Sequence, residues 1–88
     1  MNLSFTKEGW EHFTKWFTNQ RVLKKINSLI AEILRNGPLE GTGKPERLKY
    51  LGEKIYSRRI DEANRLVYEY DDDNGLLIII SCKGHYEE

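Results

Sequence analysis

The chain has 88 residues and a mass of 10.4 kDa, and its 14 basic residues balance its 14 acidic ones. A chain of this length buries about 60 to 65% of its extended surface on folding, so we expect one small domain over residues 1–88. One cysteine excludes an intramolecular disulfide, no Cys/His cluster has zinc-ligand spacing, and no apolar run exceeds five residues, so we expect a cytoplasmic protein without a metal site, cofactor or membrane span.

The first elements along the chain are a short strand and a helix. Residues 2–5 alternate polar and apolar side chains, which predicts a strand, and Thr6 is a suitable N-cap for a helix over about residues 7–18. Aromatic residues recur in this helix at spacings of three and four and form a stripe on one side: Trp10, Phe13, Trp16 and Phe17. Such a stripe is more often core than ligand site.

A second helix is predicted over about residues 20–36. Apolar residues repeat there with the helical period: Val22, Leu23, Ile26, Leu29, Ile30, Ile33 and Leu34. Thr18 or Asn19 is expected to cap its start. Gly37 and Pro38 are expected to end it, because glycine adopts the left-handed conformation and proline cannot continue a helix.

A loop over residues 39–46 separates the helices from the remaining elements. Its Gly-Lys-Pro order lacks the Gly-Lys-Ser/Thr of a triphosphate-binding loop, and Pro45 favours an extended Lys44. The rest of the chain predicts strands over residues 48–51, 55–61, 65–70 and 76–82, joined by tight turns. The order β-α-α-β-β-β-β predicts an α+β fold, in which an antiparallel twisted sheet carries the two N-terminal helices on one face.

The register of the central hairpin decides where two arginines lie. A three-residue turn centred on Glu62 places Arg59 opposite Arg65 on one face, whereas a two-residue turn divides the two arginines between faces. Like charges that oppose each other are unfavourable unless an anion lies between them. Phosphate is the natural candidate for that anion, because arginine binds it with two parallel hydrogen bonds.

Charge is distributed unevenly along the sequence. Residues 21–65 contain 11 basic and six acidic residues, a net charge of +5, whereas residues 69–88 contain one basic and six acidic residues, a net charge of −5. The middle of the chain is therefore suited to meet a polyanion. The alternative is that these are ordinary solvated charges.

The residue types expected near the arginine face are those of RNA cleavage without a metal ion: Glu46, Lys49, Arg58, Arg59, Arg65, His85 and Tyr86. In that reaction the 2′-hydroxyl loses a proton and attacks phosphorus, and the 5′-oxygen gains a proton and leaves. Fixed cations stabilise the additional negative charge of the phosphorane. An aromatic ring holds a displaced base by stacking.

The sequence resembles a known family over nearly its whole length. The segments that carry the resemblance are Trp10 and Trp16, Lys24-Lys25-Ile26-Asn27, Glu40-Gly41, Gly43-Lys44-Pro45-Glu46, Leu48-Lys49, Ser57-Arg58-Arg59-Ile60, Arg65-Leu66-Val67-Tyr68 and His85-Tyr86. In order and spacing they look like the YoeB-type toxins of the RelE superfamily, from bacterial type II toxin–antitoxin systems.

This resemblance implies a microbial-ribonuclease-like fold that enters the ribosomal A site and cleaves mRNA there, which stops translation. By position, Glu46 would be the general base and His85 the general acid, while Arg59 and Arg65 would stabilise the phosphorane. The further residues expected to contact substrate are Lys49 on the phosphate, Tyr86 on a codon base, and Arg58 and Lys44. The basic residues expected to contact ribosomal RNA are Arg21, Lys24 and Lys25.

The resemblance also implies partners. A YefM-type antitoxin would cover the active site, the complex would bind operator DNA through the antitoxin, and the toxin itself would form homodimers. Two alternatives use the same fold. A ParE-like protein acts on DNA gyrase and lacks the ribonuclease residues, and a non-catalytic RNA-binding module would use the arginine face only to hold phosphate.

Overall fold

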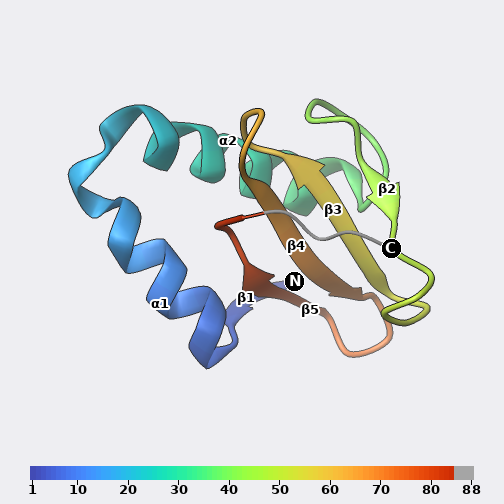
Figure 1. Cartoon of the computed structure of the whole chain (residues 1–88). Coiled ribbons are helices and arrows are strands. Elements are labelled where there is room, and N and C mark those ends of the chain that lie inside the picture. The colour runs from blue at the N-terminus through green and yellow to red at the C-terminus, as the bar shows by residue number, and fades with distance from the viewer. Residues whose placement is uncertain (85–88) are drawn as a thin grey trace.

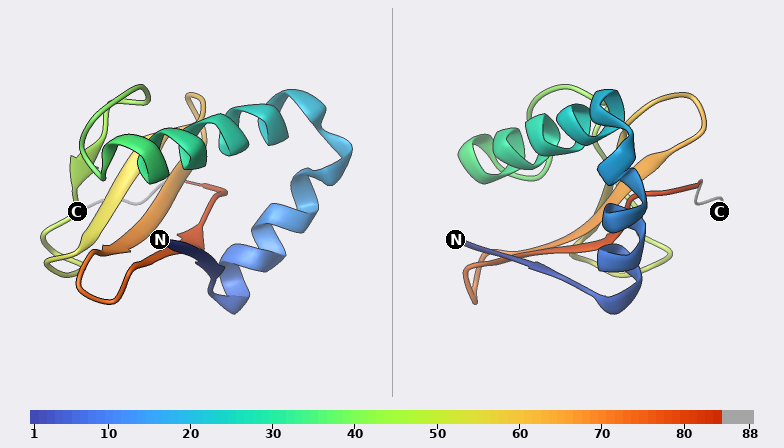
Figure 2. Two further views of the ribbon diagram at one scale, coloured as in Figure 1. Left: turned by 180° about the vertical axis from the view of Figure 1, so that it is seen from behind. Right: turned by 90° about the vertical axis from the view of Figure 1, so that its left-hand side faces the viewer.

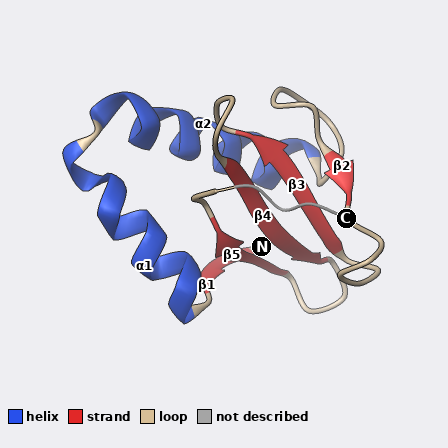
Figure 3. Ribbon diagram, viewed as in Figure 1, coloured by secondary structure: helices blue, strands red, loops and turns tan. Residues whose placement is uncertain are grey.

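The computed structural model describes residues 1–84 and consists of a five-stranded sheet with two main helices (Figure 1, Figure 3). In chain order the elements are β1 (Asn2–Phe5), α1 (Lys7–Lys15), the short 3-10 helix η1 (Trp16–Thr18), α2 (Gln20–Asn36), β2 (Glu46–Arg47), β3 (Ile55–Arg59), β4 (Arg65–Asp71) and β5 (Leu76–Ser81). The predicted α+β class and the order β-α-α-β-β-β-β are therefore confirmed.

The strands are arranged in the order β1-β5-β4-β3-β2. Antiparallel neighbours were predicted, and this holds from β2 to β5, where short connections join consecutive strands. β1 is the exception, because it lies parallel to β5. Two helices and three strands separate β1 from β5, so no tight turn fixes their relative direction.

Both helices begin at the predicted caps. The Thr6 hydroxyl accepts a hydrogen bond from the Gly9 amide (3.0 Å), and the Asn19 side chain accepts one from the Val22 amide (3.2 Å). α1 is shorter than predicted, because its last turn tightens into η1. α2 ends where predicted, and Gly37 after it has φ of 97°, a value that glycine adopts without strain.

The core lies between α2 and the face of the sheet that α2 covers (Figure 2). Its buried members are Ile26, Leu29, Ile30 and Ile33 of α2, Leu66 and Tyr68 of β4, Leu77 and Ile79 of β5, and Ile60 and Cys82. In β4 these inward positions alternate with Arg65, Val67 and Glu69. Because side chains alternate along a strand, the second set projects to the face of the sheet away from α2, called here the open face.

α1 packs alongside β1 and the end of β5. Gly9 allows this approach, since a Cβ there would collide with the carbonyl oxygen of Ile79. Phe13 and Trp16 pack against the core, and the Trp16 indole N–H donates to the Cys82 carbonyl (2.9 Å). The aromatic stripe thus belongs to the core over part of its length, while Trp10 and Phe17 are about half exposed.

Two local predictions between α2 and β3 are wrong. A strand was expected over residues 48–51, but β2 ends before Leu48, which is buried and starts a turn in which the Leu51 amide donates to the Leu48 carbonyl (2.9 Å). Lys44 was expected to be extended, but its φ is 49°. The neighbouring Gly43 carbonyl accepts from the Arg59 amide (2.6 Å), which ties this loop to β3.

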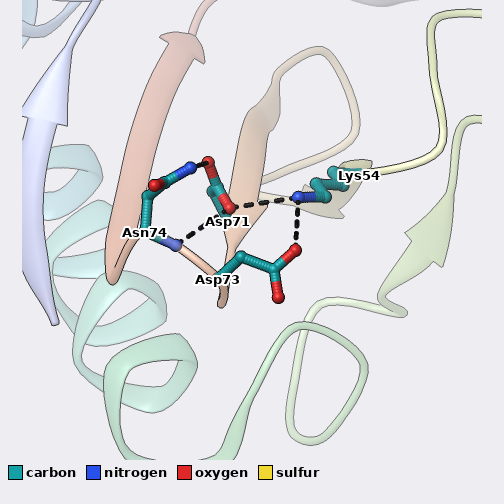
Figure 4. Close-up of polar contacts among 4 residues, drawn as sticks. All are labelled: Lys54, Asp71, Asp73 and Asn74. Carbon is teal, nitrogen blue, oxygen red and sulfur yellow. Dashed lines mark hydrogen bonds and ion pairs between the residues drawn. The ribbon is translucent and has the colours of Figure 1, made fainter.

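Ion pairs join two loops at one end of the sheet, the loop before β3 and the loop between β4 and β5 (Figure 4). The Lys54 ammonium contacts Asp71 (3.1 Å) and Asp73 (3.2 Å), and these contacts raise its pKa. Asp71 also accepts from the amide and side chain of Asn74, and these bonds together with Lys54 lower its pKa. These contacts join the two loops at the end of the sheet opposite the one where β3 finishes and β4 begins.

Within residues 1–84, no helix is long and apolar enough to cross a bilayer.

Candidate active site

Two arginines face each other at the end of the central hairpin. Arg59 of β3 pairs with Arg65 of β4, and the Ile60 amide donates to the Asn64 carbonyl (2.9 Å), which closes a three-residue turn. Asp61 braces this turn by accepting hydrogen bonds from Asn64. The first of the two predicted registers is therefore confirmed, and both guanidiniums belong to the open face.

A row of four residues crosses the open face beside these arginines. Glu46 of β2 pairs with Ser57 of β3, Ser57 pairs with Val67 of β4, and Val67 pairs with Ser81 of β5. Glu46 was expected in the loop over residues 39–46, but it lies in β2. Paired residues on adjacent strands project to the same face, so the carboxylate stands on the arginine side of the sheet.

Glu46 and Arg65 form an ion pair that bridges two strands. Nη1 of Arg65 lies 3.3 Å from Oε1 of Glu46, and the Arg65 side chain is 16% exposed against 57% for Glu46. Since β3 lies between β2 and β4, the contact passes over β3 between Ser57 and Arg59. Nε of Arg65 is buried without a hydrogen-bond partner among residues 1–84.

Two serine hydroxyls of the row were not singled out by the sequence analysis. Ser57 and Ser81 are fully buried, and neither Oγ atom has a hydrogen-bond partner in the described part of the chain. The position of Ser57 follows from strand alternation, because Ser57 precedes Arg59 by two residues. Strand alternation alone therefore places Ser57 on the same face as Arg59, whichever register the hairpin adopts.

Arg58 was expected to contact substrate, and this is wrong for the described structure. It pairs with Leu66 and points to the core side of the sheet, where it is fully buried. Its guanidinium donates to the Tyr68 hydroxyl and to the carbonyls of Gly37, Pro38, Glu40 and Thr42. A residue adjacent to Arg59 in a strand necessarily faces the other way.

Arg58 therefore organises the loop between α2 and β2. Glu32 assists from α2, since its carboxylate accepts from the amide (2.9 Å) and hydroxyl (2.5 Å) of Thr42. These two bonds and the nearby Arg58 charge lower the pKa of Glu32. Gly41 has a φ of 121°, and a Cβ there would meet both Glu32 and Arg58.

The segment that follows β5 returns to the two arginines. The Arg65 amide donates to the Gly84 carbonyl (3.0 Å), and the Gly84 amide donates to the Asn64 side chain (2.9 Å). Gly84, with a φ of 85°, is thus held beside the start of β4. The predicted general acid His85 and the predicted stacking residue Tyr86 lie outside the described residues.

Two connected grooves carry the basic residues beside this site. The larger, about 700 Å³, lies between the start of α2 and the hairpin turn and is lined by Asn19, Arg21, Val22, Lys24, Lys25, Ile60 and Asp61. The smaller, about 340 Å³, shares Lys25, Ile60 and Asp61 and adds Gly43, Lys44, Arg59 and Glu62. Lys44 thus lies in the same groove as Arg59. Lys49 is exposed in the turn after β2.

The arrangement suits chemistry on a phosphate ester. Two guanidiniums supply fixed positive charge, and a half-exposed carboxylate within reach of them is available to accept a proton. Across residues 1–84, no group of three His, Cys, Asp or Glu side chains is placed to hold a metal ion.

Comparison with known proteins identifies the family. A family model described as YoeB-like toxin of bacterial type II toxin-antitoxin system matches residues 5–86. The chain belongs to this family. Toxin YoeB of Streptomyces coelicolor is 46% identical over 87 residues, which are 98% of this chain and 100% of the relative.

Solved YoeB structures share the fold. The YoeB dimer from Staphylococcus aureus superimposes with a TM-score of 0.88 at 45% identity, and the heterotetrameric YoeB–YefM toxin–antitoxin complex from the same organism gives 0.85 at 45% identity. In both cases 98% of each chain is covered. The family match of this toxin includes Glu46, Arg59 and Arg65, and it extends to His85 and Tyr86.

Proposed function

We propose that this YoeB-like toxin is a ribosome-dependent endoribonuclease that cleaves mRNA in the A site without a metal ion and so stops translation. The observation that carries the proposal is the contact between Glu46 and Arg65, with Arg59 directly opposite Arg65. This places a proton acceptor beside two groups that bind phosphate.

In this reaction the ion pair exchanges partners. An RNA phosphate draws Arg65 away from Glu46, and the buried Nε–H of Arg65 gives it a second donor for a bidentate contact. Arg59 binds the same phosphate from the facing strand. The released Glu46 carboxylate then accepts the proton of the 2′-hydroxyl.

The cleavage step balances without a further reactant. The 2′-oxygen forms a bond to phosphorus, the bond from phosphorus to the 5′-oxygen breaks, and His85 donates a proton to that oxygen. The products are a 2′,3′-cyclic phosphate, which water opens to a 3′-phosphate, and a 5′-hydroxyl. Lys49 and Lys44 add positive charge near the phosphates, and Tyr86 stacks on a codon base.

The two grooves extend the RNA contact beyond the cleaved bond. Arg21, Lys24 and Lys25 line the larger groove, which connects through Lys25 to Arg59. We assign this surface to the phosphates of ribosomal RNA. Its contribution to binding is electrostatic and falls as salt concentration rises.

The partners follow from the same family. We propose a YefM-type antitoxin as the cognate partner, in keeping with the YoeB–YefM complex from Staphylococcus aureus, and a toxin homodimer, in keeping with the YoeB dimer from that organism. A disordered acidic segment of the antitoxin would match the basic grooves. Operator DNA would be bound only through the antitoxin complex.

The test is primer extension on mRNA in a purified translation system, with wild type, Glu46→Ala and His85→Ala. Glu53→Ala is the control, because Glu53 is an exposed carboxylate before β3, at the end of the sheet away from Arg65. We expect cleavage in the A-site codon that requires ribosomes, falls at least about a hundredfold in the two site variants, and is unchanged in the control.

Other outcomes would select the alternatives. Translation that stops without cleavage, with Glu46→Ala and His85→Ala as inhibitory as wild type, would favour a non-catalytic RNA-binding module. Unaffected translation combined with inhibition of DNA gyrase would favour a ParE-like activity.

A further inference from the structure

Ser57 lies at the centre of the proposed catalytic group. It is the cross-strand partner of Glu46, it precedes Arg59 by two residues on the same face, and its other cross-strand partner is Val67, two residues beyond Arg65. Directly paired residues have Cβ atoms about 5 Å apart, which is within reach of a hydrogen bond between a serine hydroxyl and a glutamate carboxylate.

The hydroxyl of Ser57 has no role in the folded chain as described. It is fully buried, and its Oγ has no hydrogen-bond partner within residues 1–84. A buried hydroxyl without a partner costs stability, so an alanine there would fold at least as well. This points to a role that begins when the surrounding groups change partners.

The ion pair above Ser57 provides that change. The Glu46–Arg65 contact passes over β3 between Ser57 and Arg59, and at 3.3 Å it is longer than the usual charge-assisted hydrogen bond. A phosphate bound between Arg59 and Arg65 competes for Arg65 and leaves the carboxylate without its donor. Ser57 is the neighbour of Glu46 on the adjacent strand, and its hydroxyl donates to no other group within residues 1–84.

We propose that Ser57 is a positioning residue for Glu46, whose hydroxyl donates a hydrogen bond to the carboxylate once an RNA phosphate has taken Arg65. The inference rests on the proposed function and assigns its base a second partner. In the free toxin Arg65 holds Glu46, and in the RNA-bound toxin Ser57 holds it. The carboxylate thus remains oriented toward the 2′-hydroxyl throughout the exchange.

Ser81 offers a matched control. It is also fully buried, also without a partner among the described residues, and lies in the same cross-strand row. However, Val67 separates it from Ser57, so it is three strands from Glu46. Removing either hydroxyl makes the same chemical change at a similar burial, but only Ser57 has Glu46 as a neighbour.

The experiment measures cleavage of mRNA on programmed ribosomes at saturating toxin, together with toxin affinity for the ribosome and unfolding by guanidinium chloride. We expect Ser57→Ala to slow cleavage about ten- to hundredfold, as the loss of a hydrogen bond to a charged group implies, with affinity unchanged and stability no lower than that of wild type. Ser81→Ala should match wild type in cleavage and affinity and should likewise be no less stable.

A double variant tests whether Ser57 acts through Glu46. In a Glu46→Ala background, Ser57→Ala should slow the residual cleavage no further. Wild-type cleavage by Ser57→Ala, or an equal loss with and without Glu46, would overturn the proposal while leaving the ribonuclease function in place. Wild-type cleavage by Glu46→Ala would instead overturn the proposed function, and the role of Ser57 with it.

Discussion

Replacing Arg58 with methionine tests whether this arginine stabilises the fold or binds substrate. Arg58 makes five hydrogen bonds from a fully buried position, the shortest of them to the Glu40 carbonyl at 2.7 Å and to the Tyr68 hydroxyl at 3.0 Å. Methionine fills a similar volume without a donor. Arg58→Met therefore leaves the loop between α2 and β2 without its anchor.

The expected loss of stability follows from these bonds. A hydrogen bond from a charged donor contributes about 1.5 to 3 kcal/mol. The bond to the Pro38 carbonyl is long at 3.4 Å, and the freed carbonyls regain water on the exposed side of the loop, so the full sum is not lost. We expect the free energy of unfolding to fall by about 3 to 4 kcal/mol, which corresponds to about two such bonds lost in full.

Guanidinium chloride unfolding followed by tryptophan fluorescence measures this loss. For a slope of about 3 kcal/mol per molar, the midpoint should fall by about 1 M. The matched control is Arg59→Met, the adjacent arginine on the open face, which should stay within about 0.5 kcal/mol of wild type but lose cleavage. A stability of Arg58→Met within 1 kcal/mol of wild type, with weakened RNA binding, would refute the structural role.

Three further predictions concern other parts of the fold. Gly9→Ala should lower the free energy of unfolding by about 1 to 3 kcal/mol, because its Cβ meets the Ile79 carbonyl, and thermal unfolding tests this. Burial raises the pKa of Cys82 to about 12. A thiol reagent near pH 8 should therefore modify the folded protein far more slowly than the unfolded chain. An equal rate of modification would contradict the burial of this thiol. Asn74 and Lys54 lower the pKa of Asp71, so its stabilising contribution should be full above about pH 4 and should be lost as the pH falls further. Wild type and Asp71→Asn should therefore converge in stability in acid. A difference in stability that stays constant with pH would argue against this.

Local signals predicted the helices and the hairpin well. The apolar period of α2 and its two ends are each set by neighbouring residues, Asn19 at the start and Gly37 at the end, so no distant contact is needed to define them. The opposition of Arg59 and Arg65 was one of two registers that the sequence left open, and the length of one turn decides between them. These features depend on short stretches of sequence, which is why they were predictable.

The errors involve contacts between distant segments. The conformation of Lys44 depends on how its loop is tied to β3, and the position of Arg58 depends on which face of β3 meets α2. Arg58 was grouped with Arg59 by charge, although strand alternation separates them. Ser57 was overlooked because a serine in a strand carries no signal until its cross-strand partners are known.

The place of β1 in the sheet also orders events during synthesis. Asn2 pairs with Leu76, and α1 packs on β5, so β1 and α1 contact each other but lack their partner in the sheet until β5 emerges from the ribosome. α2 and the hairpin with both site arginines are made before that point. A nascent chain therefore exposes an incomplete sheet while residues 76–81 are still in the exit tunnel, and the face that carries Arg59 and Arg65 is completed only after this stretch has emerged.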